Sequence, residues 1–324
     1  MQAVGVDVGY GVVKWVGTAG RGLYAAAWGP YTAGAEVWGI GTAERPLLVD
    51  GQPVLVGNRA AARPGARRPY ADGRLADPEA LPLLAQALWA AGVQGDIVLG
   101  SGTPLGAFAQ EREAARAAWE GRTLTLGDGT RQATVRVVRL VLRPQGVGAA
   151  LYLAGQRRLP DGAGCIAIID VGTRTTDVLT LEAEDLSPIT ALSFSLEAGA
   201  ATAAEALAAD VQRETGHLPP ADIAQAALRA AVAWRGRTLG GTAAASHLDA
   251  LAATIGAEVG RRFGADAGRV SAVAVVGGGG VLLGERLQRV LPGEPVAVTA
   301  DEAVYANALG FAGAAGRVAM RAAV

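Results

Sequence analysis

Cysteine and histidine are nearly absent from this sequence. Cys165 is the single cysteine among 324 residues, so one chain can form neither an internal disulfide nor a cysteine-ligated cluster or zinc site. We expect Cys165 to be a small buried residue at the start of a strand. The two histidines, His217 and His247, have no second histidine or cysteine close to them in the sequence. We therefore expect no metal site at either histidine.

An excess of charge of one sign is also missing. The 29 lysine and arginine residues nearly balance the 30 aspartate and glutamate residues, which leaves a net charge of −1 at pH 7. A basic surface is the usual basis of attraction to nucleic acid or to an anionic membrane. We therefore expect no direct nucleic-acid binding, and any link to DNA would pass through a DNA-binding adaptor protein.

Long apolar runs are missing as well, although 51% of the residues are hydrophobic. No stretch reaches the roughly 18 uninterrupted apolar residues that a membrane-spanning helix needs. The first residues, MQAVGVDVGYG, carry no charged segment and are interrupted by Asp7 and by glycines, unlike a signal peptide. We expect a cytoplasmic protein without a membrane span, long enough for two domains with sizeable cores.

Lysine is the rarest charged residue, because Lys14 is the only one in the chain. A lysine where arginine is the rule suggests a need for the compact charge of an ammonium group. The alternative is an ordinary lysine at the end of a strand.

The stretch Ala167 to Leu181, AIIDVGTRTTDVLTL, predicts a hairpin with a polar tip. Aliphatic and β-branched residues on both sides suit two strands, and Gly172 with its neighbouring threonines suits the turn. Backbone N–H groups in such a turn can converge on an anion, and Asp170 stands beside them at the strand end. The pattern indicates a phosphate and metal site, although many such turns have no ligand.

The same pattern occurs a second time near the N-terminus. Val4 to Val16 reads VGVDVGYGVVKWV, and its Asp7-Val8-Gly9 repeats Asp170-Val171-Gly172 at a distance of 163 residues. A third element, Val273 to Gly280, is a buried-type strand that ends in four glycines, as expected where backbone approaches a base or sugar closely. Two halves that open on one motif suggest two related domains, each contributing a hairpin to the phosphates of a nucleotide.

These three elements in this order resemble the actin, Hsp70 and sugar-kinase ATPase superfamily over nearly the whole chain. The spacing from Asp7 to Lys14 matches the actin phosphate loop, and Asp170 to Asp177 has the same length. Conventional actin has a histidine where Asp177 stands, so no histidine role is carried over. Three segments look more like the plasmid-segregation actin ParM and the archaeal actins: Val54 to Ala61, Asp96 to Gly121 and Glu302 to Gly313.

The resemblance implies an α/β protein with the actin-like ATPase fold, in which two duplicated domains with mixed sheets flank a nucleotide cleft. Domain I would span residues 1–157 and be completed by a C-terminal helix at 301–324, and domain II would span 158–300. The implied cofactors are ATP, with GTP as an alternative, and Mg²⁺ held by Asp7 and Asp170 largely through water.

The resemblance also implies which residues contact the nucleotide. The residues facing the phosphates would be Gly9, Tyr10, Gly11, Lys14, Gly172, Thr173, Arg174 and Thr175. The glycines near the nucleoside would be Gly199, at the ribose, and Gly277, Gly278, Gly279 and Gly280. The chain departs from the family pattern in two places: Thr173 and Arg174 stand where many relatives have glycines, and Tyr10 is bulky for a phosphate loop.

Gln145 is the expected catalytic residue beside Asp7 and Asp170. It follows the predicted strand Gln132 to Leu142, where the family places a glutamine or glutamate that positions the attacking water. A glutamine cannot accept a proton at neutral pH, so Gln145 would only orient the water. The alternative is a residue that merely opens the next helix.

We therefore expect an ATPase that self-associates into filaments, in a cytoskeletal or plasmid-segregation role. One alternative is a small-molecule kinase of the same superfamily, which would need an acidic base aimed at a substrate hydroxyl. No candidate base is evident. The other alternative is an ATP-dependent scaffold that never polymerises. Release of phosphate without an acceptor would exclude the kinase, and sedimentation with nucleotide would exclude the scaffold.

The remaining pattern predicts short strands early in the chain and helices later. The predicted strands include Leu23 to Trp28, Glu36 to Ile40, Pro46 to Val49, Val54 to Gly57 and Ile189 to Leu196. The predicted helices include Pro78 to Ala91 behind the N-cap Asp77, Pro104 to Trp119, Gly199 to Arg213, Pro219 to Trp234 and Ser246 to Phe263. The arginine-rich stretch Arg59 to Arg74 is expected to be a surface loop or a partner contact.

Overall fold

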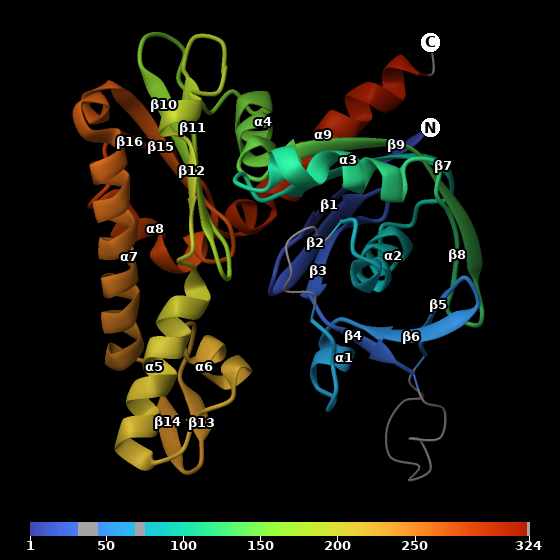
Figure 1. Ribbon diagram of the computed structural model, residues 1–324, viewed down its shortest axis with the longest axis horizontal. Coiled ribbons are helices and arrows are strands. Elements are labelled where there is room, and N and C mark those ends of the chain that lie inside the picture. Colours follow the sequence, from blue (N-terminus) through green and yellow to red (C-terminus); the bar gives the residue numbers. More distant parts are fainter. Residues whose placement is uncertain (32–44, 69–74, 323–324) are drawn as a thin grey trace. The chain divides into compact units, whose positions relative to one another are not determined.

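The computed structural model describes residues 1–31, 45–68 and 75–322, which form two compact units (Figure 1). Unit 1 comprises Met1–Tyr152 and Asn307–Val324, and unit 2 comprises Leu153–Ala306. The chain passes between units within α4 (Val147–Gly155) and again within α9 (Ala300–Arg321). The predicted strand Glu36 to Ile40 and residues 69–74 of the predicted loop lie outside the described residues. The domain boundaries after 157 and 300 stay a prediction.

Unit 1 is built on a curved sheet of nine strands in the order β3-β2-β1-β7-β9-β8-β5-β6-β4. The strands are β1 (Gln2–Val8), β2 (Val12–Gly17), β3 (Gly20–Ala25), β4 (Trp28–Pro30), β5 (Leu47–Val49), β6 (Gln52–Val56), β7 (Gly95–Thr103), β8 (Thr123–Gly127) and β9 (Gln132–Pro144). Among the described strands of this sheet, the neighbours that pair in parallel are β1 with β7 and β7 with β9, so the carboxyl ends of these three strands meet at one edge of the sheet.

Helix α2 (Leu81–Ala90) lies inside the curve of this sheet, in contact with β1, β2, β5, β6 and β8 (Figure 1). The predicted N-cap Asp77 caps the 3₁₀ turn Pro78–Ala80 that leads into α2, where its carboxylate accepts the N–H of Glu79 at 2.8 Å; α2 itself begins three residues after the predicted start. Alternation along β1 places Val4, Val6 and Val8 in the core around α2, and Asp7 therefore faces the other side of the sheet.

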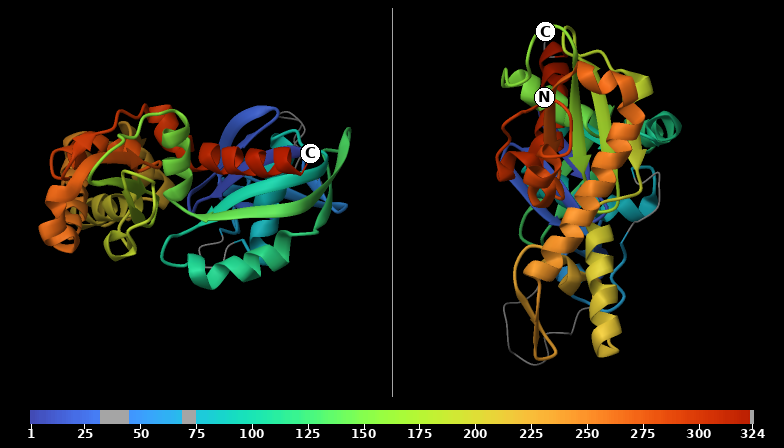
Figure 2. Two further views of the ribbon diagram at one scale, coloured as in Figure 1. Left: turned by 90° about the horizontal axis from the view of Figure 1, so that it is seen from above. Right: turned by 90° about the vertical axis from the view of Figure 1, so that its left-hand side faces the viewer.

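Helix α9 packs along that other side (Figure 2). Glycines permit this: a Cβ on Gly5 or on Gly100 would overlap the backbone carbonyl oxygen of Ala308 or Phe311. The backbones of α9 and α4 also touch, since a Cβ on Gly310 would overlap the carbonyl group of Gly148. Two further helices of unit 1 are α1 (Asn58–Ala61), which overlaps the start of the predicted loop Arg59 to Arg74, and α3 (Phe108–Trp119), which begins four residues after the predicted start.

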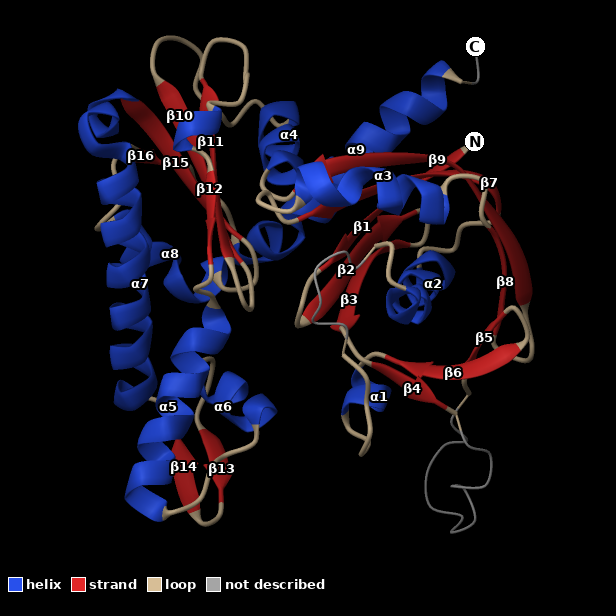
Figure 3. Ribbon diagram, viewed as in Figure 1, coloured by secondary structure: helices blue, strands red, loops and turns tan. Residues whose placement is uncertain are grey.

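Unit 2 contains a five-stranded sheet in the order β12-β11-β10-β15-β16 (Figure 3). Its strands are β10 (Cys165–Val171), β11 (Thr176–Glu182), β12 (Phe194–Leu196), β15 (Val270–Val276) and β16 (Glu294–Pro295). Its long helices are α5 (Ala200–Thr215), α7 (Thr242–Phe263) and α8 (Gly280–Gln288). The apolar faces of these helices and of β10 and β15 form a single core.

Two sequence predictions in unit 2 are wrong. The predicted helix Pro219 to Trp234 is a short helix, α6 (Ala221–Ala227), followed by the hairpin β13 (Val232–Trp234) and β14 (Arg237–Leu239). Arg235 and Gly236 have φ of 48° and 75°, as in the two-residue turns that suit hairpins. In the predicted strand Ile189 to Leu196, the residues Thr190–Leu192 form a 3₁₀ turn, and the paired strand is limited to β12.

None of the helices in the three described ranges is long and apolar enough to cross a bilayer.

Candidate functional site

The two hairpins predicted from the repeated motif have the same register and the same turn. Asp7 pairs with Lys14 between β1 and β2, and Asp170 pairs with Asp177 between β10 and β11. The turns are closed in the same way, by the hydrogen bonds from Gly9 N–H to Val12 O at 3.1 Å and from Gly172 N–H to Thr175 O at 2.8 Å. The repetition in the sequence is therefore also a repetition in three dimensions.

Three predicted site residues of unit 1 meet at the carboxyl ends of β1 and β9. The Asp7 side chain, only 4% exposed, has one oxygen 2.9 Å from Lys14 Nζ, and its other oxygen accepts from Gln145 Nε2 at 3.0 Å. Gln145 is buried as well, and its backbone N–H donates to Thr103 O at 2.8 Å. Ligands commonly bind beyond the carboxyl ends of parallel strands, so this edge of the sheet is where a site is expected.

The remaining predicted residues of unit 1 form the tip of the first hairpin. A Cβ on Gly9 would lie 2.8 Å from Val12 O, so the turn requires glycine there. Gly11 O accepts the N–H of Ala26 at 2.9 Å, which ties the tip to the end of β3. The Tyr10 side chain is buried, so this bulky residue does not leave an exposed side chain at the tip of the loop.

In unit 2 the second hairpin packs against the start of α5. Gly172 O and Thr173 O accept the N–H groups of Ala200 and Ala201 at 3.1 and 2.7 Å. A Cβ on Gly199 would lie 2.6 Å from Thr173 O. Thr175 is buried and Arg174 exposed, with its Nε 3.4 Å from a Glu197 oxygen. Gly199 is thus brought together with the predicted phosphate-binding turn.

The glycine run packs on the same hairpin. A Cβ on Gly277, where φ is +87°, would overlap Val171 O and a carboxylate oxygen of Asp170. Gly279 N–H donates to Val171 O at 2.8 Å. A Cβ on Gly278 would meet nothing within 4 Å, and one on Gly280 would make only ordinary contacts. Two of the four glycines are therefore required by contacts within unit 2, whereas Gly278 is the member with space for a ligand.

The two hairpins differ in charge at one position. Unit 1 pairs Asp7 with a lysine, whereas unit 2 pairs Asp170 with Asp177, and both aspartates are at least nine-tenths buried. Like charges on adjacent strand positions are unfavourable, and a cation beside them offsets the repulsion. No group of three or more His, Cys, Asp or Glu side chains is gathered around a metal position in the described ranges. A divalent ion here would complete its shell with water and ligand oxygens, as Mg²⁺ does.

Sequence reasoning missed three residues that support these side chains. Thr103 holds the Gln145 backbone, and its own buried hydroxyl has no hydrogen-bond partner within the part of the chain that the structure describes. The Ser195 hydroxyl donates to Asp177. Asn307 Oδ1 accepts the N–H groups of Gly146 and Ala149 at 3.0 and 3.1 Å. A signal for Asn307 was present, since an asparagine within an alanine-rich helix is unfavourable without a specific partner.

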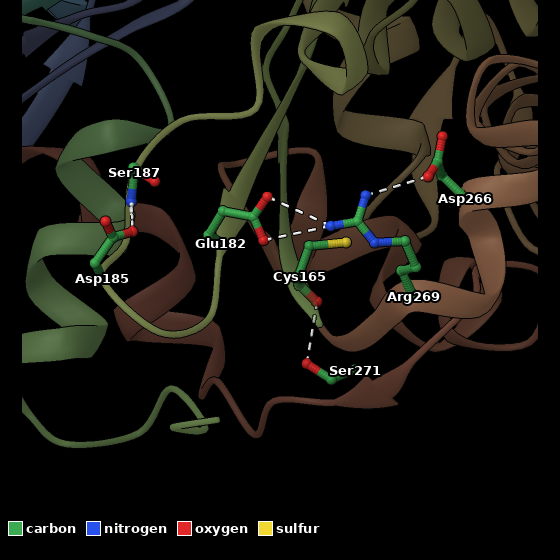
Figure 4. A network of polar contacts seen from close by, with 7 residues as sticks. All are labelled: Cys165, Glu182, Asp185, Ser187, Asp266, Arg269 and Ser271. Atoms are coloured by element: carbon green, nitrogen blue, oxygen red, sulfur yellow. Dashed lines mark hydrogen bonds and ion pairs between the residues drawn. The ribbon is translucent and has the colours of Figure 1, made fainter. Parts of the chain in front are cut away.

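Cys165 has the structural role expected of it (Figure 4). It is fully buried at the start of β10, and burial raises the pKa of its thiol. Its carbonyl oxygen accepts the Ser271 hydroxyl at 3.1 Å. The nearby Arg269 forms ion pairs with Glu182, the last residue of β11, at 3.4 Å and with Asp266, in the 3₁₀ turn before β15, at 3.2 Å.

Comparison with known proteins identifies relatives along nearly the whole chain. Residues 5–148 match the family model "Actin like proteins N terminal domain", and residues 168–289 match "Archaeal actin homologue MreB-like, C-terminal". Archaeal actin homologues of Thermoplasma acidophilum and Thermoplasma volcanium are each 40% identical over 326 residues, covering 98% of this chain and 99% of the relative.

Solved structures agree with this assignment. An archaeal actin homologue solved in complex with ADP is 39% identical, covers 98% of this chain and 100% of its own, and has a TM-score of 0.87. A ParM filament subunit from Clostridium botulinum, 18% identical over 98% of this chain and 99% of its own, has a TM-score of 0.83 and supports the fold alone. The predicted α/β actin-like ATPase fold is confirmed. The chain belongs to the archaeal actin homologues of the actin-like protein family.

Proposed function

We propose that this protein binds an adenine nucleotide with Mg²⁺ through its two hairpins, hydrolyses ATP and self-associates into filaments. The observation that carries the proposal is the repeated hairpin, in which an aspartate at a strand end stands beside a turn closed by a glycine N–H. The relative that is 39% identical was solved in complex with ADP, which supports the same ligand class here.

The side chains of unit 1 have complementary roles in this proposal. Asp7 holds the Lys14 ammonium at 2.9 Å, which directs a compact positive charge toward phosphate oxygens. The backbone N–H groups of the two turns add partial positive charge at the hairpin tips.

Asp7 and Asp170 would hold Mg²⁺ largely through water. When bound, the ion neutralises negative charge that develops on the transferred phosphoryl group.

Gln145 would orient the attacking water. Its amide nitrogen donates to Asp7 at 3.0 Å, which fixes the plane of the amide group and so the direction from which its oxygen accepts a hydrogen bond from the water. An amide in this role acts by geometry alone, because it cannot take up the proton of the water. GTP in place of ATP would use the same contacts, and nucleotide competition measures the preference.

Replacing Gln145 with alanine is expected to slow ATP hydrolysis by about tenfold or more, with nucleotide affinity nearly unchanged, since water orientation acts in the transition state. Phosphate release at saturating Mg-ATP and a nucleotide-binding titration measure the two quantities. Gln132→Ala, at the exposed opposite end of β9, is the matched control and should keep the wild-type rate of hydrolysis and the wild-type nucleotide affinity. A fall in affinity at constant rate would make Gln145 a binding residue.

Polymer is expected with ATP or a slowly hydrolysed analogue above a critical concentration, and it should be less stable after hydrolysis. Net charge of −1 keeps repulsion between stacked subunits small, and head-to-tail contacts that do not close into a ring give open filaments. Light scattering and sedimentation with and without nucleotide and Mg²⁺ provide the measurement. A chain that hydrolyses ATP yet stays monomeric in every nucleotide state would be a scaffold. The proposed cytoskeletal or plasmid-segregation role, the latter with a DNA-binding adaptor, requires filament formation.

A further inference from the structure

The start of α4 lacks a capping side chain of its own. The residue before the helix is Gly146, which has φ of +84° and no side chain. The first N–H groups of a helix have no acceptor within the helix and need one from elsewhere, most of all when buried. Asn307, only 5% exposed and distant in sequence on α9, supplies it: its Oδ1 accepts from Gly146 N at 3.0 Å and from Ala149 N at 3.1 Å.

This contact fixes the peptide group that follows Gln145. The N–H of Gly146 belongs to the same rigid plane as the carbonyl of Gln145, so the bond to Asn307 sets the orientation of that plane. On the other side, the N–H of Gln145 donates to Thr103 O at 2.8 Å. The backbone of Gln145 is therefore held by a hydrogen bond on each side. These two bonds fix the position of its Cα, from which the side chain extends to Asp7.

Asn307 is itself held in place by close helix packing. A Cβ on Gly148 would lie 2.7 Å from the Asn307 carbonyl oxygen, and Gly310 meets the backbone of Gly148 one helical turn further on. The two helices approach backbone to backbone, which brings a short side chain within reach of the end of α4. Alanine, the residue on either side at 306 and 308, could not make the two hydrogen bonds.

We propose that Asn307 is a positioning residue for hydrolysis: its acceptor oxygen caps α4 and thereby aims the Gln145 amide at the attacking water. The inference rests on the proposed function, in which Gln145 orients that water. Asn307 acts through Gln145 and its backbone, so its removal should affect the rate at saturating nucleotide and not the binding of nucleotide.

Two substitutions test the inference. Asn307→Ala is expected to lower kcat for ATP hydrolysis about tenfold, with KM within about twofold of wild type, because the defect concerns the transition state. Asn307→Asp is expected to restore kcat to within about twofold of wild type, because a carboxylate oxygen accepts the same two N–H groups and its charge suits a helix N-terminus. Steady-state phosphate release across Mg-ATP concentrations gives both constants.

Asn58→Ala is the matched control. Asn58 is the only other asparagine, and its Oδ1 accepts the backbone N–H of Ala25 at 3.0 Å in the same unit. The control loses one exposed hydrogen bond from a backbone N–H to an asparagine oxygen, and it should keep wild-type kcat. Wild-type kcat in Asn307→Ala, or an equal loss in Asn307→Asp and Asn307→Ala, would overturn the inference. If Asn307→Ala does not fold, Asn307→Asp decides alone: full activity supports the acceptor role, and a tenfold loss refutes it.

Measuring phosphate release from the wild-type protein distinguishes failure of this inference from failure of the proposed function on which it rests. Absence of phosphate release from wild type would refute the proposed function, and the inference with it. Hydrolysis by wild type together with unchanged kinetics in Asn307→Ala would refute the inference alone.

Discussion

Replacing Asp170 with alanine is expected to reduce ATP hydrolysis by at least about a hundredfold, since a lost metal contact removes several kcal/mol of charge stabilisation from phosphoryl transfer. The protein should stay folded. Asp170 lies opposite Asp177 in the hairpin register, and removing one of two buried carboxylates lowers their repulsion. The thermal unfolding midpoint should therefore be equal to that of wild type or higher. Phosphate release with excess Mg-ATP and a thermal scan measure the two effects.

The matched control is Asp222→Ala, an exposed aspartate in the first turn of α6 of the same unit. It should hydrolyse ATP at the wild-type rate. Full turnover by Asp170→Ala would remove the second hairpin from the mechanism, and a folded variant with a much lower midpoint would show that Asp170 serves mainly to stabilise unit 2.

Replacing Gly310 with alanine is expected to destabilise the protein by at least about 3 kcal/mol, at the upper end for overpacking of a core. The added methyl group would overlap the backbone of Gly148, and neither helix backbone can move aside as a flexible side chain could. On the same helix, a Cβ on Gly316 would meet nothing within 4 Å. Gly316→Ala should therefore stabilise the protein by about 0.5–1 kcal/mol, because alanine favours helix over glycine.

Urea unfolding of the two variants and of wild type gives the change in free energy of unfolding for each substitution. The signs of the two changes distinguish an effect of packing from an effect of helix propensity. Changes of opposite sign support the backbone contact between α4 and α9. A similar increase in the free energy of unfolding in both variants would mean that α4 moves away from α9 at little cost.

The sequence predicted the hairpins well because their signal is local and occurs twice. The register that pairs Asp7 with Lys14 follows from turn length alone, and the same length recurs at Asp170 and Asp177. The contact of Gln145 with Asp7 could not be predicted in this way, because it joins residues 138 apart along the chain through two parallel strand pairings. Only the resemblance to a known fold suggested that both belong to one site.

Other features escaped prediction for different physical reasons. Val232 and Trp234 fall at positions compatible with a helix, and the turn that makes them a strand depends on Arg235, an unusual residue at positive φ. The sequence predicts that the glycines at 277 to 280 all lie near the nucleoside, whereas in the structure Gly277 and Gly279 are needed for close packing against the hairpin of unit 2. The sequence does not say which glycines are needed for a close contact, nor whether that contact is with ligand or with protein.

The order in which unit 1 is assembled from the chain bears on how the protein folds during synthesis. Its strands emerge from the ribosome first, but the helical segment that covers Gly5 and Gly100 begins at Asn307 and emerges after all of unit 2. Unit 2 is continuous in sequence and can complete its core while unit 1 still exposes the face of its sheet that α9 will cover. In this chain the second unit can therefore be complete before the first, and until translation nears residue 321 the open face is a surface that chaperones can protect.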